Sequence, residues 1–392
     1  MRPAALALAV GIVAGACSSN AGPPGVNPPD AMPDARPAWL ADEKILVPGV
    51  GVTEMECRTK VCPHNENTDL INFQGAIYLV HRTAMSQVLG PNSSLRVYKS
   101  TDGGASFDLL AVLPAPENRD LRDPHFYVVN GNLTIKALTR KPINSIRDSN
   151  VDTIAVSMTS IDGGVTWTPI VEAVLMAPPT WSLWRIRERD GVYYSAAYED
   201  GDKSVVLYRS GDGVTWTAGA PIYTIAEDTP LETELVFMPS GRLLALVRMD
   251  GTDEELLGAT GRLRTKICWA MPPYDQFDCP QEFDDQRLDG PLAFFHGDRL
   301  FVVARKHLRV HNRKRTSLFE IGGTLEGGPL TIRELGELPS AGDTSYAGIA
   351  DLDGDRKVVT WYSSELRRDE QWVIAVFQPS DIWQATIDFS KL

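Results

Sequence analysis

A short motif that recurs at intervals of 50 to 60 residues constrains this chain more than any other feature. The first copy is STDGGASF at 100–107, the second is SIDGGVTW at 160–167, and a third, one residue shorter, is SGDGVTW at 210–216. Their aspartates are Asp102, Asp162 and Asp212. Self-similarity at a period of this size indicates a repeat architecture.

Each copy has the chemistry of a tight turn between two strands. The Asp carboxylate can accept hydrogen bonds from backbone N–H groups slightly further along the chain, and the glycines can adopt positive φ. An alternating run precedes each copy, at 94–98, 152–157 and 204–208, and such runs are typical of half-buried strands. The motif therefore predicts repeated β-hairpins in which the aspartates have a structural role.

This motif is identified as an Asp box, and a chain with several copies resembles the sialidase superfamily of six-bladed propellers. Six segments of similar form begin near residues 70, 125, 183, 234, 292 and 346. Each consists of an expected strand, a Gly- or Asp-rich turn and a second strand, and each is expected to begin a blade. We therefore expect an all-β fold, a six-bladed β-propeller of four-stranded antiparallel blades, over residues 44–392. An extended run at 44–54 is expected to pair with the last blade and close the ring.

The N-terminus has the features of an exported bacterial lipoprotein. Residues 1–16 contain Arg2 and an apolar stretch too short to span a bilayer, and they end in small residues before Cys17. We expect a signal peptide over 1–16, a lipid on Cys17, and a disordered Pro/Ala-rich tether over 17–43. Simple cleavage that leaves Cys17 unmodified is the alternative. The expected location is the cell envelope, with the membrane reached only through the lipid.

Four further cysteines stand close in pairs. Cys57 and Cys62 are five residues apart, and Cys268 and Cys279 are eleven apart. Export permits disulfides, and neither pair has the ligand spacing of a zinc site. We expect the bonds Cys57–Cys62 and Cys268–Cys279, and no metal site or cofactor.

Charged residues gather where the inner strands begin and where the second strands end, and in a propeller these places converge at one mouth. Arginines close the second strands of four blades, which suits an anionic substrate because Arg can bind a carboxylate with two parallel hydrogen bonds. The substrate-binding candidates are Arg248, Arg305, Arg122, Arg82, Arg185, His64 and Trp184. Trp184 is a candidate sugar platform or, equally, a core residue.

The resemblance to sialidases implies specific roles for some of these residues. Those enzymes use arginines on the sugar carboxylate, a Tyr nucleophile activated by a Glu, and an Asp acid/base. Tyr346 matches the Tyr, Glu234 the Glu, and Arg248 and Arg305 match two arginines. The family's first Arg motif is absent, and the loop 83–94 holds no carboxylate where the acid/base Asp would lie.

The missing acid must therefore come from elsewhere, and Asp123 is the candidate. It lies in the run Arg122-Asp123-Pro124, which also resembles a short motif of five-bladed furanosidase propellers. In both families two acidic functions flank the glycosidic bond.

Composition excludes one class of partner. The net charge of −13 leaves nothing to neutralise a run of phosphates, so nucleic acid is not expected.

The sequence predicts a monomeric, exo-acting glycoside hydrolase that releases a terminal acidic sugar. Another propeller glycosidase, a polysaccharide lyase, and a non-catalytic carbohydrate-binding propeller are the alternatives.

Overall fold

The computed structural model describes residues 36–88, 90–141, 152–175, 181–198, 203–226, 228–250, 264–308 and 313–392. All of these residues except Arg36 belong to one unit, Pro37–Leu392. The expected signal peptide, Cys17 and most of the expected tether lie outside the described residues. The first strand, β1 (Leu40–Val47), begins at Leu40, so residues 40–43 at the end of the expected tether belong to a strand.

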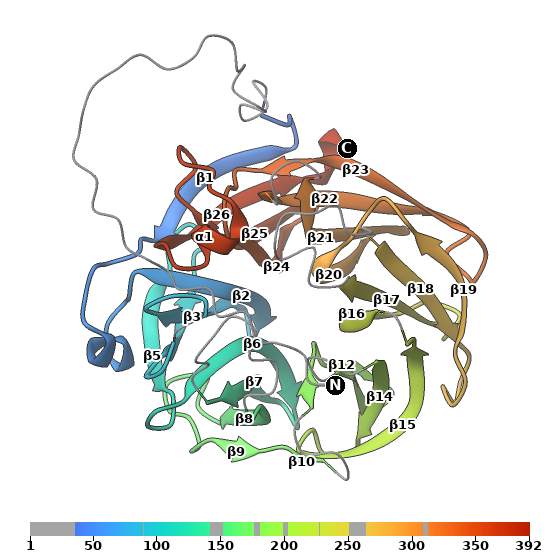
Figure 1. Cartoon of the computed structure of the whole chain (residues 1–392), viewed down its shortest axis with the longest axis horizontal. Coiled ribbons are helices and arrows are strands. Elements are labelled where there is room, and N and C mark those ends of the chain that lie inside the picture. Colours follow the sequence, from blue (N-terminus) through green and yellow to red (C-terminus); the bar gives the residue numbers. More distant parts are fainter. Residues whose placement is uncertain are drawn as a thin grey trace, which may run out of the picture. The chain divides into compact units, whose positions relative to one another are not determined.

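Consecutive strands pair antiparallel and form four-stranded blades around a centre (Figure 1). The first blade contains β2 (His64–Phe73), β3 (Ala76–Ala84), β4 (Ser94–Ser100) and β5 (Asp108–Pro114). The second contains β6 (Asp120–Val129), β7 (Asn132–Arg140), β8 (Ile154–Ser160) and β9 (Val171–Glu172).

The inner strand of the next blade is interrupted. Both β11 (Ser182–Leu183) and β12 (Arg187–Arg189) pair with β13 (Val192–Tyr198). The blade continues with β14 (Ser204–Ser210) and β15 (Thr215–Thr224), and β10 (Val174–Leu175) adds to it in parallel.

Two regular four-stranded sheets follow. One contains β16 (Thr229–Phe237), β17 (Leu243–Asp250), β18 (Arg264–Ala270) and β19 (Asp278–Phe283). The other contains β20 (Asp289–His296), β21 (Arg299–Leu308), β22 (Arg313–Gly323) and β23 (Leu330–Leu338).

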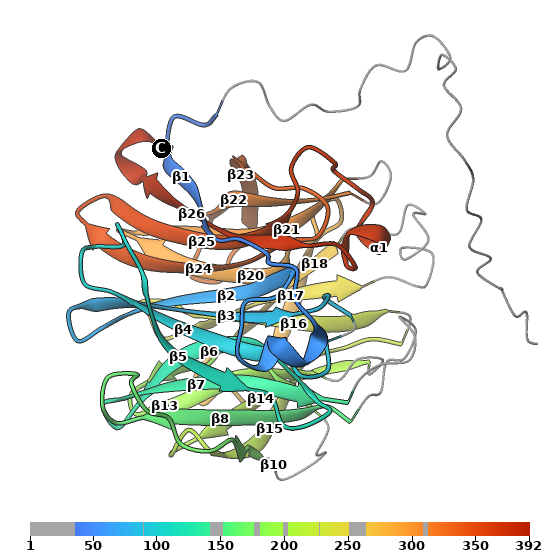
Figure 2. The same ribbon diagram turned by 90° about the vertical axis from the view of Figure 1, so that its left-hand side faces the viewer.

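The last blade joins the two ends of the described chain. It contains β24 (Thr344–Asp353), β25 (Arg356–Ser364) and β26 (Ser380–Asp388), with β1 as its outermost strand. Figure 2 shows β1 running beside β26 in a second view. One parallel bridge, His64 to Ser380, also links β26 to β2. The expected pairing of an N-terminal extended run with the last blade is therefore present, although the strand spans 40–47.

The short helices lie outside the sheets. They are η1 (Glu54–Arg58), α1 (Trp372–Ala375) and η2 (Phe389–Lys391). Among the described helices, none has the length and apolarity needed to cross a bilayer.

The Asp boxes form the turns between third and fourth strands, as the sequence predicts. In the turn between β8 and β9, Asp162 Oδ1 accepts a hydrogen bond from the Thr166 N–H at 2.9 Å, and the Ser160 hydroxyl accepts one from the Gly164 N–H at 2.7 Å. Gly164 has φ +92°, and a Cβ there would lie 2.8 Å from Leu110 of the preceding blade. Each box therefore shapes a turn and permits close packing between blades.

Both disulfides are present. Cys57 and Cys62 join with a Cα separation of 5.4 Å, and Cys268 and Cys279 with 4.0 Å. The second bond links β18 to β19, the third and fourth strands of their blade. In three other blades an Asp box forms the turn at this position.

Apolar side chains fill the spaces between neighbouring blades. Val97 of β4 packs in one cluster with Leu133 and Met158 of the second blade, and Leu244 of β17 packs in another with Val302 of β21. Burial on both faces explains why the central strands carry long apolar runs. Polar and charged side chains are left to line the centre.

Candidate active site at the centre of the propeller

The inner strands bend where they begin. In β2, β6, β20 and β24 the antiparallel register shifts by extra residues near the start of the strand. Each irregularity contains a residue with positive φ: Asn67 (53°), Asp123 (51°), Gly290 (53°) and Ser345 (94°). β16 has a similar shift between Pro230 and Thr233. Such bulges re-aim side chains, and here they bring groups from several blades together.

Tyr346 of β24 forms the centre of this arrangement. Its hydroxyl donates a hydrogen bond to Glu232 Oε1 of β16. The other Glu232 oxygen, Oε2, accepts hydrogen bonds from Arg248 Nη1 at 2.5 Å and from the Gly290 N–H at 3.0 Å. Arg248 Nη1 also lies 3.2 Å from the Tyr346 hydroxyl. The phenol and the carboxylate are therefore held by groups from different blades.

Gly290 is required where the Tyr346 ring crosses the backbone of β20. A Cβ at Gly290 would lie 1.7 Å from Tyr346 Cδ1 and 1.9 Å from Cε1. With its positive φ and its N–H on Glu232, Gly290 positions both the tyrosine and the carboxylate.

Cations and aromatic rings surround the Tyr346 side chain. The Arg305 guanidinium lies 5.2 Å from the ring centroid, and Trp184 contacts the ring edge to face at 5.7 Å. Burial and the Glu232 charge raise the pKa of Tyr346 well above its usual value, against the opposing effect of the two arginines. The phenol is therefore protonated at neutral pH and depends on a base to become a nucleophile.

Asp123 approaches the same centre from β6. One of its oxygens accepts a hydrogen bond from Asn67 Nδ2, and the other lies 3.6 Å from Arg122 Nε. Burial raises the pKa of Asp123 despite the nearby Arg122 and Lys136, and the Glu232 charge adds to the increase. A carboxyl group with a raised pKa suits a proton donor.

Glu234, the expected partner of Tyr346, is not that partner. It is fully buried, forms an ion pair with Arg187 of β12, and has its other oxygen 3.8 Å from Arg185 Nε. The register shift before Thr233 explains the difference, because it turns Glu232 toward Tyr346 while Glu234 faces the neighbouring blade.

Three expected substrate contacts are instead internal. Arg82 is fully buried and donates to both oxygens of Asp120, to Glu66 and to a backbone carbonyl. Arg185 donates to Asp69 at 2.6 Å and to the Ala347 carbonyl at 2.7 Å. His64 is fully buried beside Glu66. These side chains have their partners inside the protein, so we correct their assignment as sugar ligands.

Trp184 is also buried, with 1% of its surface exposed. It packs against Tyr346 and, at 4.9 Å, against His125. The sequence leaves two roles for Trp184, sugar platform and core residue. The structure shows a core residue that packs against the Tyr346 ring.

The expected cationic ring is largely balanced by carboxylates. Asp289 is fully buried and lies 3.1 Å from Arg248 Nε, 2.7 Å from Arg287 Nε and 3.1 Å from Arg305 Nη2. Its pKa is well below the usual range because these charges outweigh the effect of burial. Arg305 Nη1 has no hydrogen-bond partner and lies 3.5 Å from Asp343 Oδ1. Arg248 and Arg305 contact Tyr346, and Arg122 interacts with it electrostatically.

Sequence reasoning missed Glu232 as the partner of Tyr346, and it missed Gly290. One signal could have found Glu232. An acid and an Arg sixteen residues apart pair across the first hairpin of three blades, as Glu66 with Arg82, Glu232 with Arg248 and Asp289 with Arg305.

A groove of ≈ 590 Å³ lies away from this centre, beside β5 and the segment between β8 and β9. Its lining includes Leu113, Met158, Trp167 and Ile170, and none of the lining residues is titratable. It therefore offers no catalytic groups.

The fold and the arrangement of its centre define the class as a β-propeller with a buried Tyr–Glu pair. No family model and no curated protein matches the sequence. Solved structures do match. A protein of unknown function from Dyadobacter fermentans is 17% identical, with 88% of this chain and 99% of that chain covered and a TM-score of 0.63.

Two glycosidases share the architecture. The NanB sialidase of Streptococcus pneumoniae is 10% identical, with 88% of this chain and 71% of that chain covered and a TM-score of 0.63. An α-L-arabinanase of Penicillium chrysogenum is 13% identical, with 90% and 99% covered and a TM-score of 0.58. At these identities the likeness establishes the propeller fold.

Proposed function

We propose that this protein is a propeller glycoside hydrolase in which Tyr346 is the nucleophile, Glu232 its base and Asp123 the acid/base. The observation that carries the proposal is the hydrogen bond from the Tyr346 hydroxyl to Glu232. A phenol with an ordinary pKa near 10 is a poor nucleophile at neutral pH, and an adjacent base activates it.

The groups account for a balanced two-step reaction. Tyr346 Oη bonds to the anomeric carbon as the glycosidic C–O bond breaks, the phenol proton passes to Glu232, and Asp123 donates a proton to the leaving oxygen. Water then attacks the anomeric carbon and gives a proton to Asp123. The bond to Tyr346 breaks, and Glu232 returns the proton to the phenol.

Arginines beside the nucleophile favour an acidic terminal sugar as the substrate, sialic acid or a relative. Arg122, Arg248 and Arg305 all act on Tyr346 electrostatically. Arg305 Nη1 is buried, makes no hydrogen bond with the described residues and lies 3.5 Å from Asp343 Oδ1, so it retains the capacity to donate to a sugar carboxylate that enters the centre. A neutral phenol also avoids the repulsion that a carboxylate nucleophile would exert on an anionic sugar. A lipid on Cys17 would place this activity at the cell envelope, where glycans are exposed.

One observation favours a second candidate, a glycosidase for a neutral sugar. Asp289 is shared by Arg248, Arg287 and Arg305, so much of the positive charge is already compensated. Glu232 and Asp123 would then supply the two acidic functions that such a reaction needs.

A release assay over aryl sialosides, uronides and arabinosides tests the proposal. We expect release from a sialoside or uronide, and loss of that release in Tyr346→Phe with the fold retained by circular dichroism. Release of arabinose alone would support the second candidate. Binding to a glycan array without release from any substrate would contradict hydrolysis and indicate a carbohydrate-binding propeller.

A further inference from the structure

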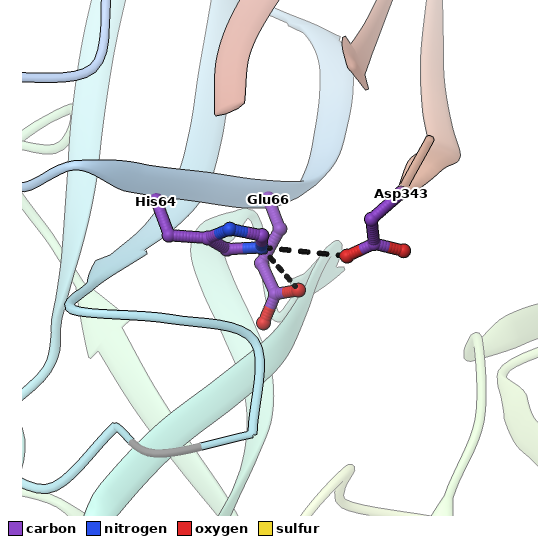
Figure 3. Close-up of side chains that lie close together, drawn as sticks. All are labelled: His64, Glu66 and Asp343. Carbon is purple, nitrogen blue, oxygen red and sulfur yellow. Dashed lines mark ion pairs between the residues drawn. The ribbon is translucent and has the colours of Figure 1, made fainter. Parts of the chain in front are cut away.

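Three buried side chains converge near the seam between the first and last blades. His64 and Glu66 come from β2, and Asp343 precedes β24 directly (Figure 3). His64 Nε2 lies 3.4 Å from Glu66 Oε2 and 3.5 Å from Asp343 Oδ2. All three residues are fully buried.

Every other polar atom of the trio has a partner. Glu66 Oε1 accepts from Arg82 Nη1 at 2.5 Å. Asp343 Oδ1 accepts from Trp372 Nε1 at 3.0 Å and from the Tyr362 hydroxyl at 3.2 Å. The three atoms that face one another have no hydrogen bond. Each of the three residues therefore has one potential metal-ligand atom without a hydrogen bond, and these atoms face a common point.

The histidine is oriented as a ligand. His64 Nδ1 lies 2.7 Å from the Gln378 carbonyl oxygen, which can only accept, so Nδ1 carries a proton. In neutral imidazole this leaves a lone pair on Nε2, aimed at two carboxylate oxygens. An Nδ1–H bonded to a carbonyl is the usual outer contact of a metal-binding His. The Arg82 and Trp372 contacts fix the carboxylates in the same way.

We propose that His64, Glu66 and Asp343 bind a divalent transition metal, with zinc the best fit. Zinc bonds of about 2.0–2.2 Å in tetrahedral geometry place ligand atoms roughly 3.3–3.6 Å apart. The two separations from His64 Nε2 fall in that range. The nitrogen ligand favours zinc over Ca²⁺ or Mg²⁺, which take oxygen ligands. This differs from the sequence-based expectation of no metal site, which considered cysteine pairs.

A proton on Nε2, shared with both carboxylates, is the competing occupant. Burial disfavours the charged imidazole, but Asp343 and Glu66 outweigh it and raise the pKa of His64 to about 9 when no metal is bound. Charge-assisted N–H···O bonds are about 2.7–2.9 Å long. The distances from His64 Nε2 to the two carboxylate oxygens, 3.4 and 3.5 Å, are longer than this, which favours a metal ion over a shared proton. A bound ion would tie β2 to the start of β24, where one backbone bridge joins the first blade to β26.

Zinc binding to the full chain tests this inference without any assay of glycosidase activity. Protein treated with chelator and dialysed would be titrated with Zn²⁺ by calorimetry, and its metal content measured by mass spectrometry. We expect one zinc per chain, a raised melting temperature, and tetrahedral Co²⁺ absorption bands after substitution. Glu66→Gln, which preserves side-chain shape, should weaken zinc binding at least 100-fold.

His296→Ala is the matched control because His296 and Asp355 form a His–Asp pair away from the cluster, at 3.1 Å. It should retain the single zinc. Wild-type protein that binds no stoichiometric zinc, or binds it equally well after Glu66→Gln, would overturn the proposal. Binding of Ca²⁺ in preference to Zn²⁺ would also overturn the assignment. If Glu66→Gln fails to fold, the wild-type stoichiometry and the Co²⁺ spectrum decide.

Discussion

At the scale of single residues, a glycine positions Tyr346 and Glu232, the proposed nucleophile and its proposed base. The Gly290 N–H donates to Glu232, and the Cδ1–Cε1 side of the Tyr346 ring occupies the place that a Cβ on Gly290 would take. Any side chain at this position would displace the ring, and with it the hydrogen bond to Glu232.

Gly290→Ala should therefore reduce turnover at least tenfold, since misplacement by about 1 Å can cost on the order of 100-fold in rate. Steady-state kinetics on a hydrolysed substrate would measure the change. Gly297→Ala is the matched control, because Gly297 also has positive φ (60°) but a Cβ added there would meet no atom within 4 Å. Equal losses in both variants would show that backbone strain alone is responsible.

Asp123 should control the alkaline limb of the pH–rate profile. In the proposed reaction Asp123 acts first as a proton donor, so activity should fall as pH rises through its pKa, which burial raises above the usual value of 3.8. Asp123→Asn should lower kcat on an unactivated glycoside by about 100-fold or more. The loss should be smaller with a nitrophenyl leaving group, which departs without protonation. An unchanged alkaline limb in the variant would assign the acid to another residue.

The residues of the site can be predicted from sequence only in part. Tyr346, Arg248 and Arg305 follow from the resemblance to sialidases, and in the structure both arginines contact the tyrosine. Asp123 follows from its place near the start of a strand, and it interacts electrostatically with Glu232. The choice between Glu232 and Glu234 depends on a bulge in β16, which no sequence pattern reveals. Some partners of Arg82 and His64 lie far along the chain, namely Asp120 for Arg82 and Gln378 and Asp343 for His64, so the burial of these two residues cannot be predicted from local sequence.

At the scale of elements, the Asp boxes are predictable because their hydrogen bonds are local. Ser100, Ser160 and Ser210 each donate to the Asp two residues ahead. The interrupted inner strand, β11 and β12, is not predictable in this way. At the break, Trp184 packs against Tyr346 and Arg185 donates to Asp69, both of which belong to other blades.

Asp162→Asn should remove a pH-dependent part of the stability. Hydrogen bonds from Thr166 and Ser160 lower the pKa of Asp162 from 3.8 to about 2. The contribution of Asp162 to the free energy of unfolding is thus complete above pH 3.8 and is lost as pH falls through 2. The melting temperature of the wild type should exceed that of the variant at pH 7, and the gap should close in acid. Asp275→Asn, a change at an exposed surface position, is the control.

At the scale of the whole molecule, the ring is closed by a strand from the start of the described chain. β1 adds to β26, and Trp39, just before β1, is buried with its Nε1 donating to the Leu335 carbonyl at 3.2 Å. The sequence predicts that an N-terminal run closes the ring. The register is not predictable, because strand pairing over more than 300 residues leaves no local pattern.

Trp39→Ala should therefore lower the free energy of unfolding by about 3–5 kcal/mol, the usual cost of deleting a buried aromatic side chain. Chemical denaturation would measure it. Ile45→Ala, on the same strand but with 45% of the residue exposed, should cost much less. Comparable losses would mean that β1 contributes through its backbone pairing alone.

The central claim is that Glu232, and not Glu234, activates Tyr346. The most direct test is to compare kcat for Glu232→Gln and Glu234→Gln on one hydrolysed substrate, normalised to folded protein. We predict that Glu232→Gln lowers kcat at least 100-fold and that Glu234→Gln lowers it less than tenfold. A larger loss in Glu234→Gln, or full activity in Glu232→Gln, would contradict the account.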